Sequence, residues 1–195
     1  MTTETKALVL GGAECVWDDI DESERLLGPE WWDIVVAAND VGCHWPKQLD
    51  AWASLHPNKF RDWTKLRASL GHPNGYQTFT RRGSGQKHAD VAVTHRFGGG
   101  ASGLLAVTVA LHLGATRVVL CGIPMEKVPH FAESEVHVRG RPWRPDAHRR
   151  KWKQHAAELS GTVRSMSRVY GPDGWRSSFT RNLLGAPSPE WLAGG

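Results

Sequence analysis

The sequence lacks the long apolar runs of membrane proteins, since no stretch of its 195 residues approaches the roughly 20 apolar residues that a spanning helix requires. Residues 1–6 are polar and lead directly into a strand-like segment, without the apolar core of a secretion signal. We therefore expect a cytoplasmic protein with no membrane segment. The composition, 40% hydrophobic and 23% charged, is typical of a folded globular chain.

Cysteine is also scarce. Cys15, Cys43 and Cys121 form no Cys-x-x-Cys pair, which argues against a disulfide framework and against a zinc knuckle. We expect them to be buried thiols. Ten histidines could suggest a metal centre, but no two of them have the short spacing of a zinc motif, so we predict no metal site.

The common nucleotide-binding motifs are absent too. The turn at residues 11–13 lacks the Gly-x-Gly-x-x-Gly spacing, and no acidic residue ends the second strand where a dehydrogenase would bind a ribose hydroxyl. The chain also has no Gly-x-x-x-x-Gly-Lys-Ser/Thr sequence. These absences disfavour a dinucleotide dehydrogenase and a P-loop kinase.

Strand-like and helix-like segments alternate along the chain. Buried strands are expected over residues 6–10, 33–38, 50–55, 76–80, 91–93, 116–121 and 162–166, and helices over 17–27, 58–70, 103–113 and 145–159. This order predicts one α/β domain over residues 1–195, with a doubly wound, mostly parallel, Rossmann-like sheet. Residues 126–145 are expected to form a loop or lid, and residues 170–195 a turn-rich tail with one short helix.

A glycine-rich turn at residues 98–103 runs directly into an apolar helix. Such a turn places unpaired N–H groups and the positive end of the helix dipole around one small volume, which suits a phosphate or carboxylate. In a parallel sheet, ligands bind outside the carboxyl ends of the strands. The predicted strands end there in small or polar residues at 11–12, 39–40, 56–57 and 122–125.

Charge is distributed unevenly within the formal net charge of +4. Residues 14–33 are strongly acidic, whereas residues 139–153 carry seven basic side chains against one acidic, a local charge of +6. The basic segment favours phosphorylated or polyanionic ligands, although a solvated helix face would have the same composition. Ten tryptophans exceed what packing a small core needs, so some are expected to line a pocket.

Four short motifs carry a resemblance to a known group. They are Leu8–Gly12 with Asp18 after it, Ala38–Asp40, Ser102–Gly103 opening a helix, and Val118–Pro124. Over residues 6–125 the chain resembles the sialyltransferase-like and MptE-like (6-hydroxymethylpterin diphosphokinase-like) Rossmann proteins, and it is similar to small uncharacterised phage or prophage proteins. The resemblance implies a nucleotide beside the first glycines and Asn39, a phosphate at Ser102 and Gly103, and group transfer from an activated nucleotide. The chain differs from sialyltransferases at Pro124, where they have an aspartate.

The predicted site draws on all four strand ends. The nucleotide-binding set comprises Gly11, Gly12, Asn39, Gly100, Ser102, Gly103, Gly122 and Met125. The catalytic set comprises His130, His56 and Asp40, because a loop histidine near the end of a central strand can accept a proton from an acceptor hydroxyl. Leaving-group charge would be compensated by Arg144, Arg149 and Lys151.

We therefore predict a nucleotide-binding group transferase, glycosyltransferase-like or diphosphokinase-like, that uses a nucleotide-activated sugar or a related phosphorylated metabolite. The expected partner is this nucleotide-containing small molecule, with no further cofactor and no membrane. The alternative hypothesis is a non-catalytic accessory protein, phage-encoded, that binds nucleotides or nucleic acid through the basic segment at 139–153.

Overall fold

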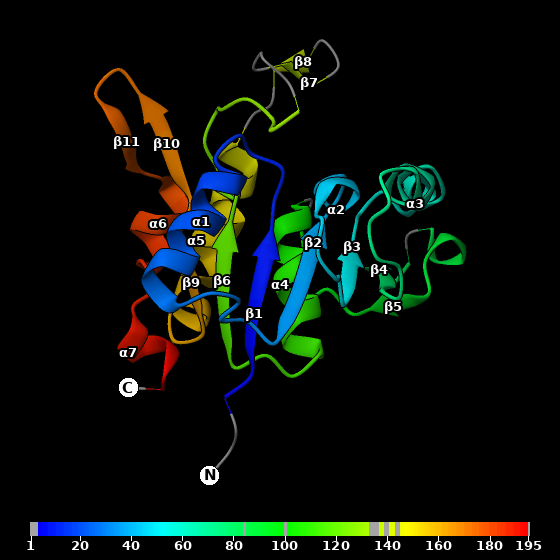
Figure 1. Cartoon of the computed structure of the whole chain (residues 1–195), viewed down its shortest axis with the longest axis horizontal. Coiled ribbons are helices and arrows are strands. Elements are labelled where there is room, and N and C mark those ends of the chain that lie inside the picture. The colour runs from blue at the N-terminus through cyan, green and yellow to red at the C-terminus, as the bar shows by residue number, and fades with distance from the viewer. Residues whose placement is uncertain are drawn as a thin grey trace.

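The protein has a Rossmann-like α/β fold. In the computed structural model, which describes residues 4–83, 85–99, 101–132, 137–138, 141–142 and 145–194, a seven-stranded parallel sheet forms the centre, in the order β5-β4-β3-β2-β1-β6-β9 (Figure 1). Its strands are β1 (Lys6–Leu10), β2 (Ile34–Ala38), β3 (Ala51–Ala53), β4 (Gln77–Arg81), β5 (Val91–Val93), β6 (Arg117–Cys121) and β9 (Val163–Ser165). The predicted fold class is confirmed.

Helices cover both faces of this sheet because the strand residues alternate between two apolar clusters. One cluster joins Ala7 and Val9 to α4 (Ser102–His112), α5 (Asp146–Leu159) and α6 (Phe179–Leu184). The other joins Leu8 and Leu10 to the helices α1 (Val16–Leu27), α2 (Val41–His44), α3 (Phe60–Ser69) and α7 (Pro189–Leu192). A strand segment with both faces covered is apolar, as residues 7–10 of β1 and 118–121 of β6 are.

Helix α4 is the most deeply buried of these helices. Its residues 103–110 are all buried, and it packs against β1, β2 and β3. An all-apolar helix of this kind is expected in the centre of a fold, as the sequence indicated. Helix α1 is instead amphipathic and directs Val16 and Ile20 into the core. The three cysteines are free and buried, as predicted.

The segment after β9 corrects the expectation of a turn-rich tail with one short helix. Strands β10 (Arg168–Gly171) and β11 (Gly174–Ser177) form an antiparallel hairpin, and two short helices, α6 and α7, follow it. The hairpin projects from the body of the protein on the side where the sheet strands end (Figure 1). Each strand has only four residues, so the sequence pattern was too short to separate them from the turn at Pro172 and Asp173.

Other short elements were also missing from the sequence-based prediction. They are α2, the 3-10 turns η1 (Pro57–Lys59) and η2 (Gln86–His88), and the antiparallel pair β7 (His137–Val138) and β8 (Arg141–Pro142). The expected loop or lid at 126–145 lies partly outside the described residues. No helix in the described parts of the chain is long and apolar enough to cross a membrane.

Candidate functional site

The candidate site lies where the sheet strands end. Strand β1 lies between β2 and β6, and the chain extends the sheet in both directions from this point. Crevices at such switch points bind ligands in α/β proteins. The residues that follow the strands there are Gly11 after β1, Asn39 after β2, Ser54 after β3 and Gly122 after β6.

A carboxylate–imidazole pair occupies one side of this edge. Nε2 of His130 lies 3.2 Å from Oδ1 of Asp40, although the two residues are 90 positions apart. Backbone pairing fixes the histidine, since Ala13 and His130 form an isolated antiparallel bridge and Phe131 N donates to Gly12 O at 3.0 Å. The structure therefore brings together two of the three predicted catalytic residues.

The hydrogen bonds of His130 define its role within the pair. Ala132 N donates to Nδ1 at 3.3 Å, so this network assigns the ring proton to Nε2, facing Asp40. Burial opposes ionisation of Asp40, but the hydrogen bond from His130, and the positive charge of its ring when protonated, outweigh it and keep the pKa of Asp40 below its ordinary value. Asp40 thus remains a carboxylate that orients the imidazole.

Gly12 lies directly against this histidine. A Cβ at Gly12 would be 2.6 Å from Nε2 of His130, so a larger residue would displace the ring from Asp40. Gly11 instead allows the loops after β1 and β6 to approach, because a Cβ there would collide with Gly122 O and with the Ile123 side chain. The structure thus gives Gly11 and Gly122 a packing role, and their contact with a nucleotide stays a prediction.

Asn39 is held in a left-handed backbone conformation, with φ of 62°. This conformation is uncommon for residues other than glycine and often marks functional turns. Its Oδ1 accepts a 2.9 Å hydrogen bond from Ser54 Oγ, and its carbonyl accepts one from the Trp52 indole. His56 donates its backbone N–H to Ser54 Oγ at 2.9 Å, its side chain is exposed, and within the described residues no hydrogen bond or ion pair joins the His56 ring to Asp40 or His130.

The opposite side of the edge is rich in hydrogen-bond donors. Gly98 and Gly99 both have positive φ, and α4 begins without a side-chain cap on its N–H groups. Lys151 lies against this turn, because a Cβ at Gly99 would be 3.0 Å from Lys151 Cγ. The glycine-rich turn and the basic helix α5, predicted separately, are therefore neighbours. Gly100 and Arg144 lie outside the described residues.

Trp152 is a residue that sequence reasoning missed. Its side chain is fully buried, and Nε1 has no hydrogen-bond partner among the described residues. The indole packs at the start of α4, where a Cβ on Gly103 would lie 3.6 Å from Trp152 Cζ2. Gly103 is itself buried against Ile123, so packing also accounts for this glycine. A tryptophan in the middle of a basic helix was the available signal.

Met125 ends the turn after β6 in a strained conformation, with φ of 52°. Arg149 holds it by donating from Nε to Met125 O at 2.7 Å, and the same guanidinium pairs with Glu126. The other carboxylate oxygen of Glu126 accepts the Phe179 N–H at 3.0 Å. Arg149 therefore connects this edge of the sheet to α6.

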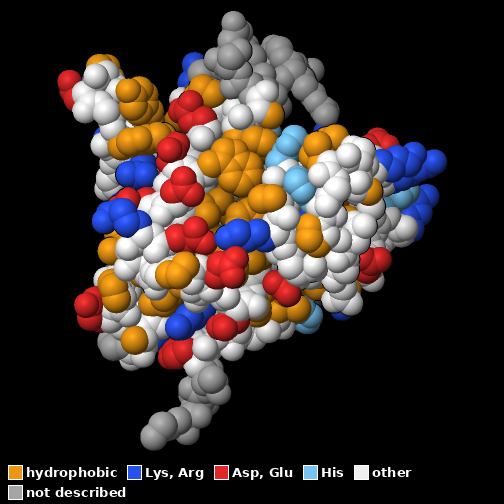
Figure 2. Space-filling model, viewed as in Figure 1, with side chains coloured by type: hydrophobic (Ala, Val, Ile, Leu, Met, Phe, Trp, Pro, Cys, Tyr) orange, Lys and Arg blue, Asp and Glu red, His pale blue; other side chains and the backbone are white. Residues whose placement is uncertain are grey.

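The two sides of the site differ in charge. Figure 2 shows acidic side chains gathered over α1, beside an exposed hydrophobic patch that borders histidines. Around the Asp40–His130 pair, Phe131 contacts Trp17, His44 and His130 at ring-centroid distances of 5.8, 5.2 and 4.4 Å. The acidic first turn of α1 disfavours an anion, whereas α4 has no acidic residue in its first turn.

The described residues contain no group of three or more His, Cys, Asp or Glu that could hold a metal ion. Comparison with known proteins finds no matching family model, no matching curated protein and no matching solved structure. The fold and the geometry of this edge therefore define the chain as a Rossmann-like α/β protein with a donor-rich turn on one side and an Asp–His pair on the other.

Proposed function

We propose that the protein binds a nucleotide-containing phosphorylated small molecule at this edge and transfers a group from it to an acceptor hydroxyl. The observation that carries the proposal is the buried Trp152 N–H, which has no partner among the described residues and lies at the uncapped start of α4. A buried donor without an acceptor is costly, and a phosphate bound at the start of α4 would satisfy it once the groups that cover the indole N–H move aside. Lys151 beside Gly99 supplies the positive charge.

The Asp–His pair would serve the acceptor. The bond between the transferred group and a phosphate oxygen breaks, its electron pair stays on the phosphate, and the acceptor hydroxyl attacks and loses its proton. His130 would take that proton at Nδ1 in place of the long contact from Ala132 N. Asp40 stays ionised and stabilises the resulting imidazolium, which its lowered pKa supports.

Thermal unfolding with a panel of nucleoside mono- and diphosphates tests binding. A ligand that binds only the folded protein raises Tm, and we expect at least one nucleotide to do so at millimolar concentration. Lys151→Gln should lower the affinity for that nucleotide about tenfold, because one charged contact is lost. Lys65→Gln, on an exposed position of α3, removes the same charge elsewhere and should change nothing. No response to any nucleotide would contradict the proposal.

Three further variants separate the roles of the site. Trp152→Phe keeps an aromatic ring but removes the N–H, so the ligand-induced Tm shift, measured against its own free protein, should shrink. Gly103 is a poor test position, because a side chain there would meet Ile123 at 3.2 Å. His130→Gln and Asp40→Asn should keep nucleotide binding and lose turnover of a nucleotide-sugar panel. If the unmodified protein binds nucleotides but turns over none of the nucleotide-sugars, this would support the non-catalytic alternative.

A further inference from the structure

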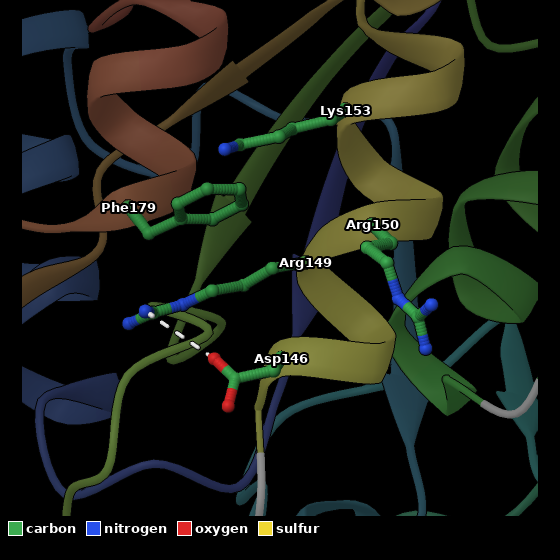
Figure 3. Close-up of a pocket in the computed structure, with 5 residues that line it drawn as sticks. All are labelled: Asp146, Arg149, Arg150, Lys153 and Phe179. Carbon is green, nitrogen blue, oxygen red and sulfur yellow. Dashed lines mark ion pairs between the residues drawn. The ribbon is translucent and has the colours of Figure 1, made fainter.

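We infer that the hollow between α5 and α6 is a second anion-binding site, which takes a small dianion such as inorganic phosphate or the phosphate group of a monoester. The hollow has a volume of about 350 Å³ and is lined by Asp146, Arg149, Arg150, Lys153 and Phe179 (Figure 3). Its lining carries three cations against one carboxylate.

The charges in this hollow are only partly compensated. Arg149 pairs with Glu126, and its Nη1 lies 4.0 Å from the carboxylate of Asp146, whose side chain is 86% exposed. Lys153 and Arg150 have no carboxylate partner among the residues that the structure describes. Arg149 and Lys153 lie one turn apart on α5 and reach toward the same ring, so an anion held between them would relieve their mutual repulsion.

Phe179 determines what kind of ligand fits. The Arg149 guanidinium lies 5.1 Å from the ring centroid and Lys153 Nζ lies 5.8 Å from it. Figure 3 shows both side chains reaching from α5 toward Phe179, on either side of its ring, while Arg150 leaves the same helix on its other flank. Because cations already cover the ring, a nucleobase has no free aromatic face to stack on. The site therefore favours a compact anion over a stacked base.

This site is distinct from the one under Proposed function. At 3.6 residues per turn, Lys151 points about 160° away from Lys153 around α5, toward Gly99. The two sites still share a structural link, since Arg149 also holds the Met125 carbonyl at the edge of the sheet. An anion in the hollow would act on the same guanidinium that fixes this turn.

Phosphate titration followed by backbone amide NMR at constant ionic strength tests the inference. We expect the amides of Lys153 and Phe179 to shift and saturate with added phosphate. The double variant Arg150→Gln/Lys153→Gln should weaken this response about tenfold or more. The matched control, Arg61→Gln/Lys65→Gln, removes two exposed charges that lie about one turn apart on α3 and should leave the response unchanged.

Three results would overturn the inference: no saturable shift at these amides, equal weakening in the control variant, or a shift with a ten-residue deoxythymidine oligonucleotide but not with phosphate. The last result would assign the surface to nucleic acid instead. Lys151→Gln should move the nucleotide-induced shifts at Gly99 to about tenfold higher nucleotide concentration and leave the phosphate response at Phe179 intact. If nucleotides cause no shift at Gly99 while phosphate still shifts Phe179, the proposed function is contradicted and the inference of a second site stands.

Discussion

At the scale of single residues, the Asp40–His130 pair depends on two opposing influences. Burial raises the pKa of Asp40, while the His130 hydrogen bond and charge lower it, and the second influence prevails. An acid with a lowered pKa stabilises the fold above its unfolded pKa, about 3.9, and this contribution is lost as the pH falls through the folded pKa. Asp40 is therefore ionised wherever the protein operates near neutral pH.

We predict that His130→Gln raises the pKa of Asp40, because burial then acts with less opposition. Carboxyl ¹³C NMR titration of Asp40 in the two proteins measures the change directly. His56→Gln is the matched control, since its exposed side chain does not reach the pair, and it should leave the titration of Asp40 unaltered. An unchanged Asp40 titration in His130→Gln would show that the 3.2 Å contact contributes nothing to its ionisation.

At the scale of elements, the turn at residues 122–125 is built by segments far away in the sequence. Its backbone groups are bonded by side chains of Asp19 in α1, Ser167 after β9, Thr180 in α6 and Arg149 in α5. The C-terminal segment, which looked like an irregular tail in the sequence, therefore shapes the edge of the sheet where the ligand is proposed to bind.

Thr180→Val tests how much this support contributes. Thr180 Oγ1 donates to Ile123 O at 2.6 Å and is buried beside Ser165 and Ser178. Valine has a similar shape but leaves the buried carbonyl without this donor, which should lower the free energy of unfolding by about 1–3 kcal/mol. Urea unfolding gives the value. Thr180→Ser retains the hydroxyl and should lose less, whereas equal losses in both variants would point to the methyl group instead.

At the scale of the whole molecule, the elements that could be predicted from the sequence are those whose apolar pattern reflects burial. The apolar runs of β1, β2 and β6, and the apolar helix α4, follow from burial on both sides of a parallel sheet. Strand ends at Asn39 and Gly122 follow from the same pattern. The pairing of Asp40 with His130 could not be predicted, because a loop contact between residues 90 positions apart leaves no periodic signal.

The burial of Asp19 could not be predicted either. Asp19 belongs to an acidic stretch whose composition is typical of a solvated helix face, yet its side chain is fully buried. It accepts the Gly122 N–H at 2.9 Å, and its other oxygen lies 3.7 Å from Arg168 Nε at the base of the hairpin. Burial raises the pKa of Asp19 to about 6, against the lowering influence of Gly122 N–H, the Cys15 thiol, Arg168 and Arg181. One carboxyl group thus couples α1, the β6 turn and the β10–β11 hairpin to pH.

The sign of this coupling gives a prediction for the stability of the protein. An acid whose pKa is raised on folding contributes stability that is fully present below its unfolded pKa, about 3.9, and is lost as the pH rises through about 6. Asp19→Asn removes this dependence, so the unfolding free energy of the variant relative to the unmodified protein should rise by about 2 kcal/mol between pH 4 and pH 7. Urea unfolding at pH 4, 5, 6 and 7 measures it, with Asp18→Asn as the exposed control. A difference that does not vary with pH would mean that Asp19 is ionised throughout this range, and that its contact with Arg168 compensates for its burial.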